Sequence, residues 1–147
     1  METAAARGQT RHVLRVYRIP FSTNVERVAL AAGHKGLEVD WVDVDPLDRS
    51  PVEAVSGQVL VPVLVTGGEV VFDSPRVIEW LEERHPEPPL YPNEAALRAE
   101  VIVFVEWFNE VWKRPPNLIA AELERPAPDA GRIEELSRRM RAALDVF

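Results

Sequence analysis

A proline-rich segment, residues 86–92 (PEPPLYP), divides the sequence into two parts with different hydrophobic periodicity. Before it, segments that alternate between apolar and polar residues, typical of strands, are separated by segments with helical spacing. After it, apolar residues recur only at helical spacing. Because repeated prolines interrupt both helices and central strands, the segment predicts a stiff linker between two structural units.

The first part predicts an α/β fold. In chain order the pattern indicates a strand at 12–17, a helix after 22–24 that ends near Lys35 and Gly36, a strand at 37–44, a short irregular helix within 46–57, an apolar strand at 59–65, a turn at Gly67-Gly68, a strand at 69–72 and a helix from Ser74 to His85. Strands separated by a helix favour a parallel pair, and the turn adds an antiparallel one. We therefore expect a four-stranded mixed sheet with helices on both faces.

The second part predicts helices alone. One helix is expected over 94–114, ending at Pro115-Pro116, and a second from Asp129 onward, after a loop at 126–129. The first has a wide apolar sector that a single neighbour would not cover, and no stop signal follows the second at Phe147. We therefore expect 94–147 to be a truncated helical domain that has lost a covering C-terminal stretch or dimerises through its helices.

These patterns set the expected boundaries: a flexible tail at 1–11, an α/β domain at 12–86, a linker at 87–93 and the partial helical domain at 94–147.

Composition excludes several classes of function. The net charge is −7, which argues against a nucleic-acid partner. The absence of cysteine excludes disulfides, thiolate metal sites and a cysteine nucleophile. No apolar run approaches the ~20 residues of a membrane span, and the N-terminus does not resemble a secretory signal. The three histidines lack metal-site spacing. We expect a cytoplasmic protein with neither a membrane nor a metal.

Three positions carry candidate chemistry, each with a purely structural alternative. Pro62 lies inside an apolar run that otherwise indicates a strand. Proline is unusual in a central strand, so either Pro62 has a specific role or the strand lies at the edge of the sheet. Ser74 precedes Pro75 at a predicted helix start, where free N–H groups can hold a carboxylate; a plain N-cap is the alternative. Ser22 precedes the first helix and could equally be an N-cap.

Three segments together resemble the glutathione S-transferase family: residues 22–36 (STNVERVALAAGHKG), 61–64 with 73–74 (VPVL and DS), and 81–92 (LEERHPEPPLYP). Each is weak by itself, but their order and spacing also match. The resemblance covers 12–92 closely and 94–114 more loosely. It implies a thioredoxin-like, glutathione-binding domain followed by an all-α domain.

The resemblance also implies a glutathione site. Pro62 is expected to be cis, with the main chain of Val61 pairing with the cysteine part of glutathione. Ser74 is expected to bind the γ-glutamyl carboxylate through its hydroxyl and N–H groups, with Asp73 close to that end of the ligand.

Ser22 falls where relatives carry a catalytic serine or cysteine, with Thr23 and Asn24 as alternatives. The resemblance implies that it donates a hydrogen bond to the glutathione sulfur. Glutathione is then a co-substrate conjugated to a small electrophile by a homodimeric enzyme. The alternative is a non-catalytic interaction or regulatory module with the same fold.

One departure from the family pattern lies directly before the proline motif. Many relatives have a glycine two residues before the valine of the Val-Pro pair and a lysine or glutamine immediately before it. This chain has Val59 and Leu60 there, and Gln58 is the candidate replacement for the missing polar contact.

Overall fold

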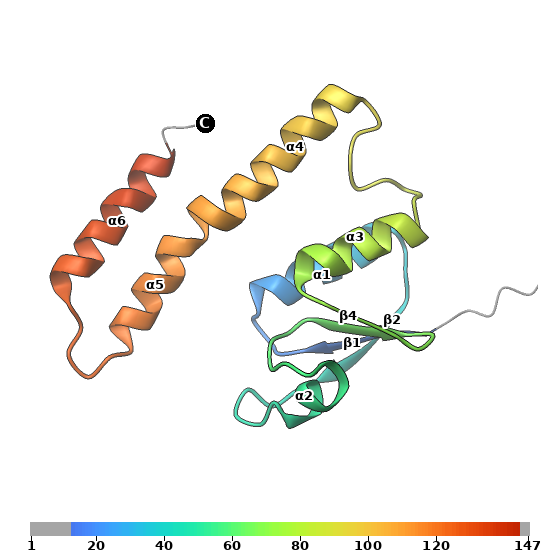
Figure 1. The fold of residues 1–147 in the computed structure, drawn as a ribbon, viewed down its shortest axis with the longest axis horizontal. Helices are drawn as coiled ribbons and strands as arrows, with labels where there is room; N and C mark the ends of the chain where they lie inside the picture. Colours follow the sequence, from blue (N-terminus) through green and yellow to red (C-terminus); the bar gives the residue numbers. More distant parts are fainter. Residues whose placement is uncertain (1–12, 145–147) are drawn as a thin grey trace, which may run out of the picture. The chain divides into compact units, whose positions relative to one another are not determined.

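The computed structural model describes residues 13–144 (Figure 1), so that the expected flexible tail at 1–11 and Phe147 lie outside the described residues. The chain divides into two compact units between Leu90 and Tyr91.

The first unit is the four-stranded mixed sheet with helices that the sequence predicts. Its elements are β1 (Leu14–Arg18), α1 (Thr23–His34), β2 (Val39–Asp43), α2 (Ser50–Ser56), β3 (Val63–Thr66), β4 (Glu69–Phe72) and α3 (Ser74–Arg84). The strand order is β2-β1-β3-β4. β1 and β2 are parallel, whereas β3 is antiparallel to both β1 and β4.

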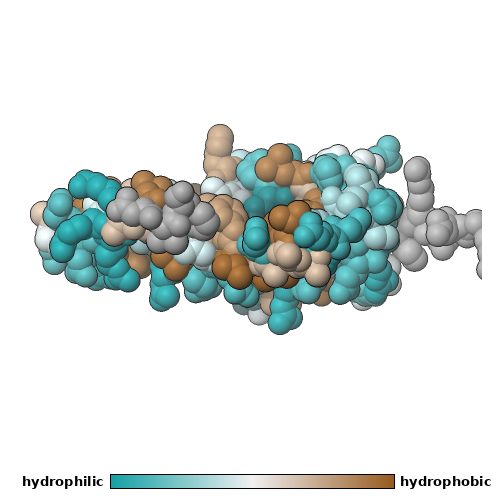
Figure 2. All heavy atoms as spheres, turned by 90° about the horizontal axis from the view of Figure 1, so that it is seen from above, coloured by the Kyte–Doolittle hydropathy of each residue, from teal (hydrophilic) through white to brown (hydrophobic). Residues whose placement is uncertain are grey.

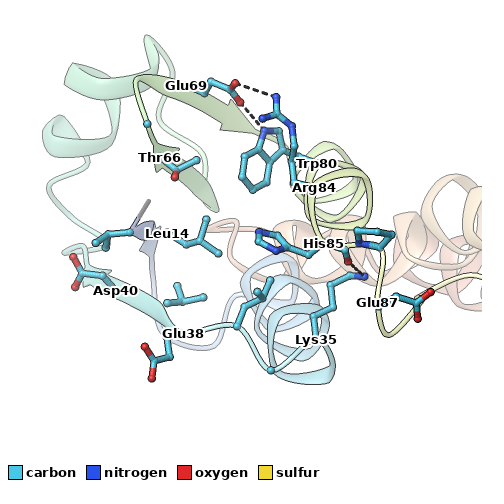
Figure 3. A pocket seen from close by; sticks show the side chains of 16 residues that line it. Leu14, Lys35, Glu38, Asp40, Thr66, Glu69, Trp80, Arg84, His85 and Glu87 are labelled. Atoms are coloured by element: carbon cyan, nitrogen blue, oxygen red, sulfur yellow. Dashed lines mark hydrogen bonds and ion pairs between the residues drawn. The ribbon is translucent and has the colours of Figure 1, made fainter. Parts of the chain in front are cut away.

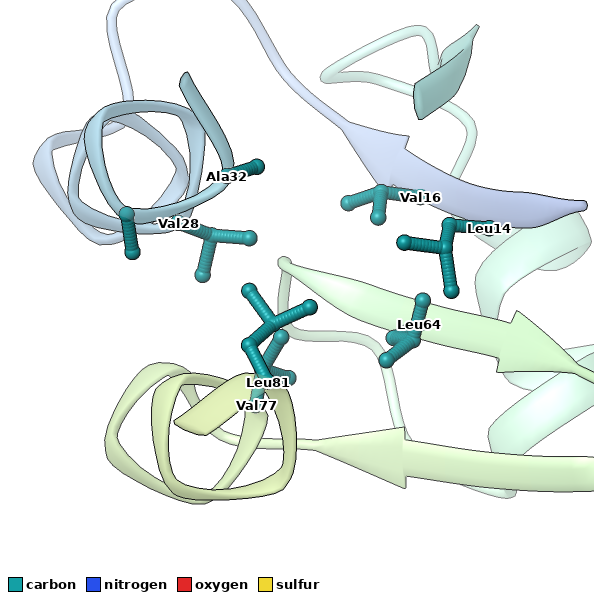
Figure 4. Packing of buried hydrophobic residues seen from close by; sticks show 8 residues of the cluster. Leu14, Val16, Val28, Ala32, Leu64, Val77 and Leu81 are labelled. Atoms are coloured by element: carbon teal, nitrogen blue, oxygen red, sulfur yellow. The ribbon is translucent and has the colours of Figure 1, made fainter. Parts of the chain in front are cut away.

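Two apolar clusters show that helices cover both faces of this sheet. On one face, Leu64 of β3 packs with Val28 of α1 and Val77 of α3 (Figure 4). Its neighbour Val63 belongs to the second cluster, with Val52 of α2. Because successive side chains of a strand point to opposite faces, these two clusters lie on opposite sides of the sheet.

The third strand is shorter than the apolar run predicts. β3 begins at Val63, directly after Pro62, and residues 59–62 are outside it. Proline lacks the N–H group that a strand ladder needs, so the ladder starts beyond it. The predicted turn is confirmed: Gly67 and Gly68 have φ of 53° and 88°.

The second unit contains more helices than the sequence predicts. They are α4 (Ala95–Trp107), a π-helical turn η1 (Phe108–Trp112), α5 (Arg114–Leu123) and α6 (Ala130–Leu144). The helix expected over 94–114 corresponds to α4 and η1, which together reach Trp112, but the prediction missed α5, because Pro115-Pro116 lies in the first turn of a new helix. Proline is tolerated in the first helical turn, where its missing N–H would have no partner.

Helix α4 has no buried residue, although α5 packs against α6 within the same unit. Its large apolar side chains are exposed at Leu97, Ile102, Val103 and Phe104. The surface view shows apolar side chains open to solvent among polar ones (Figure 2). Across residues 13–144, none of the helices combines the length and the apolar character that crossing a membrane requires.

Candidate functional site

The topology of the sheet brings the predicted site segments to one end. Tyr17 of β1 pairs with Val63 of β3, and Val63 pairs with Phe72 of β4. The segment with Ser22 follows β1, the Val61-Pro62 pair precedes β3, and the segment with Ser74 follows β4. All three segments therefore lie at the same end of the strands, although they are far apart in the sequence.

The Val61-Pro62 peptide is cis, as the family resemblance implies. Pro62 is fully buried and Val61 is half-buried. Within residues 13–144, the main-chain N–H and C=O of Val61 take part in no hydrogen bond. They remain available to an extended ligand that lies alongside, as in the addition of a short strand.

Helix α3 presents main-chain donors beside this position. It begins at Ser74, so the expectation that Ser74 is the N-cap was wrong by one residue: Asp73 holds that position. Ser74 is only 2% exposed, and no hydrogen bond between described residues uses its hydroxyl or its N–H group. Free N–H groups at a helix start attract a carboxylate.

Asp73 has an unusual backbone conformation, with φ of 73° and ψ of 123°. A non-glycine residue with positive φ is uncommon, and such strain concentrates at functional sites. Its carboxylate makes no capping hydrogen bond to α3. This acidic side chain is therefore exposed beside the free N–H groups instead of satisfying them.

Ser22 holds the N-cap position of α1, but its hydroxyl does not cap the helix. The side chain is half-buried, whereas the neighbouring Thr23 is exposed. Asn24 is half-buried and already has an interaction partner. The structural alternative of a capping serine thus has no hydrogen bond to support it, and the Ser22 hydroxyl is available to a ligand.

Gln58 is engaged within its own loop. Its side-chain amide accepts from Leu60 N–H at 2.6 Å and donates to Leu60 C=O at 3.0 Å and to Ser56 Oγ at 2.9 Å. Gln58 therefore stabilises the loop before Pro62, whose sequence departs from the family pattern.

Arg49 lies against the same loop and was missed in the sequence. Its Nη1 donates to Val59 C=O at 3.4 Å, and its Nε donates to Pro46 C=O at 3.2 Å. One signal could have found it: no other lysine or arginine occurs between Lys35 and Arg76.

A second arginine at this end of the sheet is already paired. Arg18 Nε donates to Asp43 Oδ1 at 2.7 Å, and this hydrogen bond holds the pKa of the Asp43 carboxyl below its ordinary value. Arg18 also lies over the ring of Trp41. Over the part of the chain described, no three His, Asp or Glu side chains are grouped to hold a metal ion.

Comparisons with known proteins identify the family. Residues 16–89 match the family described as glutathione S-transferase, N-terminal domain. The chain is 34% identical over 92 residues to maleylpyruvate isomerase of Ralstonia sp, covering 60% of this chain and 43% of the relative. It is 31% identical over 145 residues to glutathione S-transferase 3 of Zea mays, covering 91% and 65%.

A solved structure shows the same fold. The glutathione S-transferase of Methylobacillus flagellatus KT, crystallised with glutathione bound, superposes with a TM-score of 0.79 at 24% identity over 90% of this chain and 67% of that one. The chain thus spans less than half of the Ralstonia relative and about two thirds of the longer matches. From the family match over 16–89 and the shared fold, this chain belongs to the glutathione S-transferase family.

Proposed function

We propose that this chain binds glutathione at the end of the sheet where Ser22, Val61 and Ser74 lie. One observation carries the proposal: at the same end of the sheet, the main-chain groups of Val61 and the first N–H groups of α3 form no hydrogen bond with any residue from 13 to 144. A tripeptide with a terminal carboxylate offers a partner to both. The glutathione-bound structure of the Methylobacillus relative supports this choice of ligand.

Each residue has a distinct role in this proposal. The N–H group and hydroxyl of Ser74 donate to the γ-glutamyl carboxylate, and the Asp73 carboxylate balances the ammonium group beside it. Val61 pairs its main chain with the cysteinyl part of the ligand. Arg49 is the cation available to the glycyl carboxylate at the other end.

Ser22 is proposed to activate the sulfur. Bound glutathione supplies a thiol with an ordinary pKa of about 8.5, which is mostly protonated at neutral pH. A hydroxyl donor and the N–H groups at the start of α1 stabilise the thiolate and so lower that pKa. Ser22 acts as a donor and forms no covalent bond.

The reaction is proposed to be attack of this thiolate on a small electrophile. Phe21 is 97% exposed beside Ser22 and offers an apolar surface to such a molecule. A second candidate reaction is glutathione-dependent isomerisation of a maleyl acid, which the similarity to maleylpyruvate isomerase favours. Both reactions need the same thiolate, so they share Ser22.

Calorimetry with reduced glutathione tests the binding proposal. We expect saturable binding to the wild type and about tenfold weaker binding to Ser74→Ala, since a hydrogen bond to a charged group contributes about 1.5–3 kcal/mol. Ser137→Ala, which removes a half-buried serine of α6, is the matched control and should bind like the wild type. Absence of heat at millimolar glutathione would reject the proposal.

Activity assays then separate the alternatives. Turnover of an aromatic halide indicates conjugation, and conversion of maleylpyruvate indicates isomerisation. Binding without either activity indicates the non-catalytic module. We further propose a homodimer that acts in the cytoplasm, where thiols are kept reduced. The apolar side chains exposed on α4 supply surface for such an interface, and light scattering tests it.

A further inference from the structure

The loop that leads into Val61 lacks the apolar packing that holds the core of the first unit. Val59 and Leu60 are 43% and 66% exposed, so burial of their side chains does not fix this loop. Arg49 Nη1 reaches Val59 C=O at 3.4 Å, which is long for a hydrogen bond. The main chain next to Val61 therefore needs another interaction to hold it in place.

The turn at the other end of β3 shows how a solvent-exposed segment of this sheet is held. Glu69 follows that turn and accepts hydrogen bonds from Trp80 Nε1 at 2.7 Å and from Arg84 Nη2 at 3.1 Å (Figure 3). Both donors belong to α3, so side chains of a helix fix the turn. In the loop before Val61, a single side chain from the loop itself, that of Gln58, supplies the equivalent contacts.

Gln58 binds both main-chain groups of Leu60. Its Oε1 accepts from Leu60 N–H at 2.6 Å, and its Nε2 donates to Leu60 C=O at 3.0 Å. The same Nε2 donates to Ser56 Oγ at 2.9 Å, and Ser56 Oγ donates in turn to Val52 C=O at 2.8 Å. Val52 is fully buried, so these hydrogen bonds connect the loop to the packed side of α2. Within residues 13–144, no other group forms a hydrogen bond with the main chain of Leu60.

These contacts imitate those of a neighbouring strand. In an antiparallel ladder, a residue exchanges its N–H and C=O bonds with the residue opposite, and the next residue directs its own groups to the other side. The Gln58 amide takes the place of the opposite residue for Leu60. The main-chain groups of Val61, the next residue, form no hydrogen bond with any residue from 13 to 144, in agreement with this arrangement.

We propose that Gln58 is a positioning residue for the glutathione site, an inference that rests on the proposed function. It holds Leu60 so that the N–H and C=O groups of Val61 are in place before the cysteinyl part of the ligand arrives. Gln58 makes no contact with the ligand, because its Nε2 already donates twice within the loop. It compensates for the apolar Val59 and Leu60 by ordering the loop.

Calorimetry on the full 147-residue chain tests this role with two thiols, glutathione and γ-glutamylcysteine, which lacks the glycyl residue. In Gln58→Leu the loop has to be ordered when a ligand binds, so both thiols should bind more weakly by the same factor, roughly tenfold. A direct contact between Gln58 and the glycyl carboxylate would weaken glutathione alone. Asn117→Leu, a similar change at an exposed position of α5, is the control and should bind both thiols like the wild type.

A conservative variant tests the two-sided contact. In Gln58→Asn, the side chain can still accept from the N–H two residues on, but it is too short to donate to Leu60 C=O as well. We expect its affinity for both thiols to lie between those of the wild type and Gln58→Leu. Without ligand, amide hydrogen exchange at Leu60 should be faster in Gln58→Leu than in the wild type. Circular dichroism checks that each variant is folded.

The outcomes separate this role from glutathione binding itself. Absence of glutathione binding to the wild type overturns both the proposed function and the role of Gln58. Wild-type affinity in a folded Gln58→Leu, or a loss confined to glutathione, overturns the positioning role alone. Equal losses for the two thiols, with a partial loss in Gln58→Asn, support it.

Discussion

Lys35 forms an ion pair with Glu82 even though the lysine side chain has no exposed surface. Its ammonium also donates to His85 C=O at 2.6 Å and to Pro88 C=O at 3.0 Å. Glu82 in turn accepts from the Leu90 N–H at 3.1 Å. This cluster joins the end of α1 to the segment that follows α3, within the first unit.

Replacing Lys35 with methionine should strongly destabilise the first unit. The change roughly preserves the length of the side chain, but it leaves the Glu82 carboxylate without its cation and removes the donor to the His85 and Pro88 carbonyls. Removing one member of a buried ion pair typically costs about 3–5 kcal/mol. Arg15→Met, which breaks the exposed pair with Asp40, is the control and should cost at most about 1 kcal/mol. Equal effects in urea unfolding would contradict this assignment.

The sequence predicts the first unit well because its signals are local. Alternation, turn glycines and helix starts depend on neighbouring residues, and Gly36 indeed follows α1 with φ of 64°. The burial of Lys35 could not be predicted, since a lysine near a helix end usually lies in solvent. Its partners are some fifty residues away, and periodicity carries no information on such contacts.

At the candidate site, too, local sequence signals were predictable and contacts between distant residues were not. The order of the motifs indicates Ser22, Val61 and Ser74, but the position of Arg49 depends on how the loop before Pro62 folds back. In the second unit, Pro115 was misread because proline both ends and begins helices.

Ser22→Ala should reduce turnover more than glutathione affinity. The hydroxyl makes no capping hydrogen bond, so its removal leaves α1 intact, while the bound thiolate loses a donor. Loss of one such donor corresponds to a fall in kcat of about tenfold or more. The pKa of bound glutathione, followed by thiolate absorbance, should rise at the same time. Thr23→Val serves as the control. An equal loss of turnover in Thr23→Val would show that Ser22 is not the specific donor to the glutathione thiolate.

Asp73→Gly should separate stability from glutathione binding. Glycine adopts the positive φ of this position without steric cost, so we expect relief of about 1 kcal/mol of strain and a higher melting temperature. Glutathione affinity should nevertheless fall, because the carboxylate proposed to face the ligand ammonium is lost. Asp40→Gly in β2 should instead lower the melting temperature. A stabilised Asp73→Gly with unchanged affinity would remove Asp73 from the proposed site.

Glu122 should make the stability of the second unit depend on acid pH. Its buried carboxylate accepts from Asp129 N–H at 3.0 Å and from Arg125 Nη1 at 2.7 Å, and Arg132 lies nearby. The hydrogen bond from the Asp129 main chain, followed by that from Arg125, holds the pKa of Glu122 below its ordinary value. These contacts tie the end of α5 to the start of α6.

The direction of the pH effect follows from that lowered pKa. Because the folded state holds the carboxylate charged more strongly than the unfolded state does, its stabilisation is complete above the ordinary glutamate pKa of about 4.3. It is lost as the pH falls through the lower pKa of the folded state. Thermal melts followed by helical circular dichroism from pH 7 to pH 3 should show this loss. Glu122→Gln should have a lower melting temperature at pH 7, and its melting temperature should fall less as the pH is lowered. The exposed Glu134→Gln should keep the wild-type dependence of melting temperature on pH. Parallel slopes for all three proteins would show that Glu122 does not control the acid response.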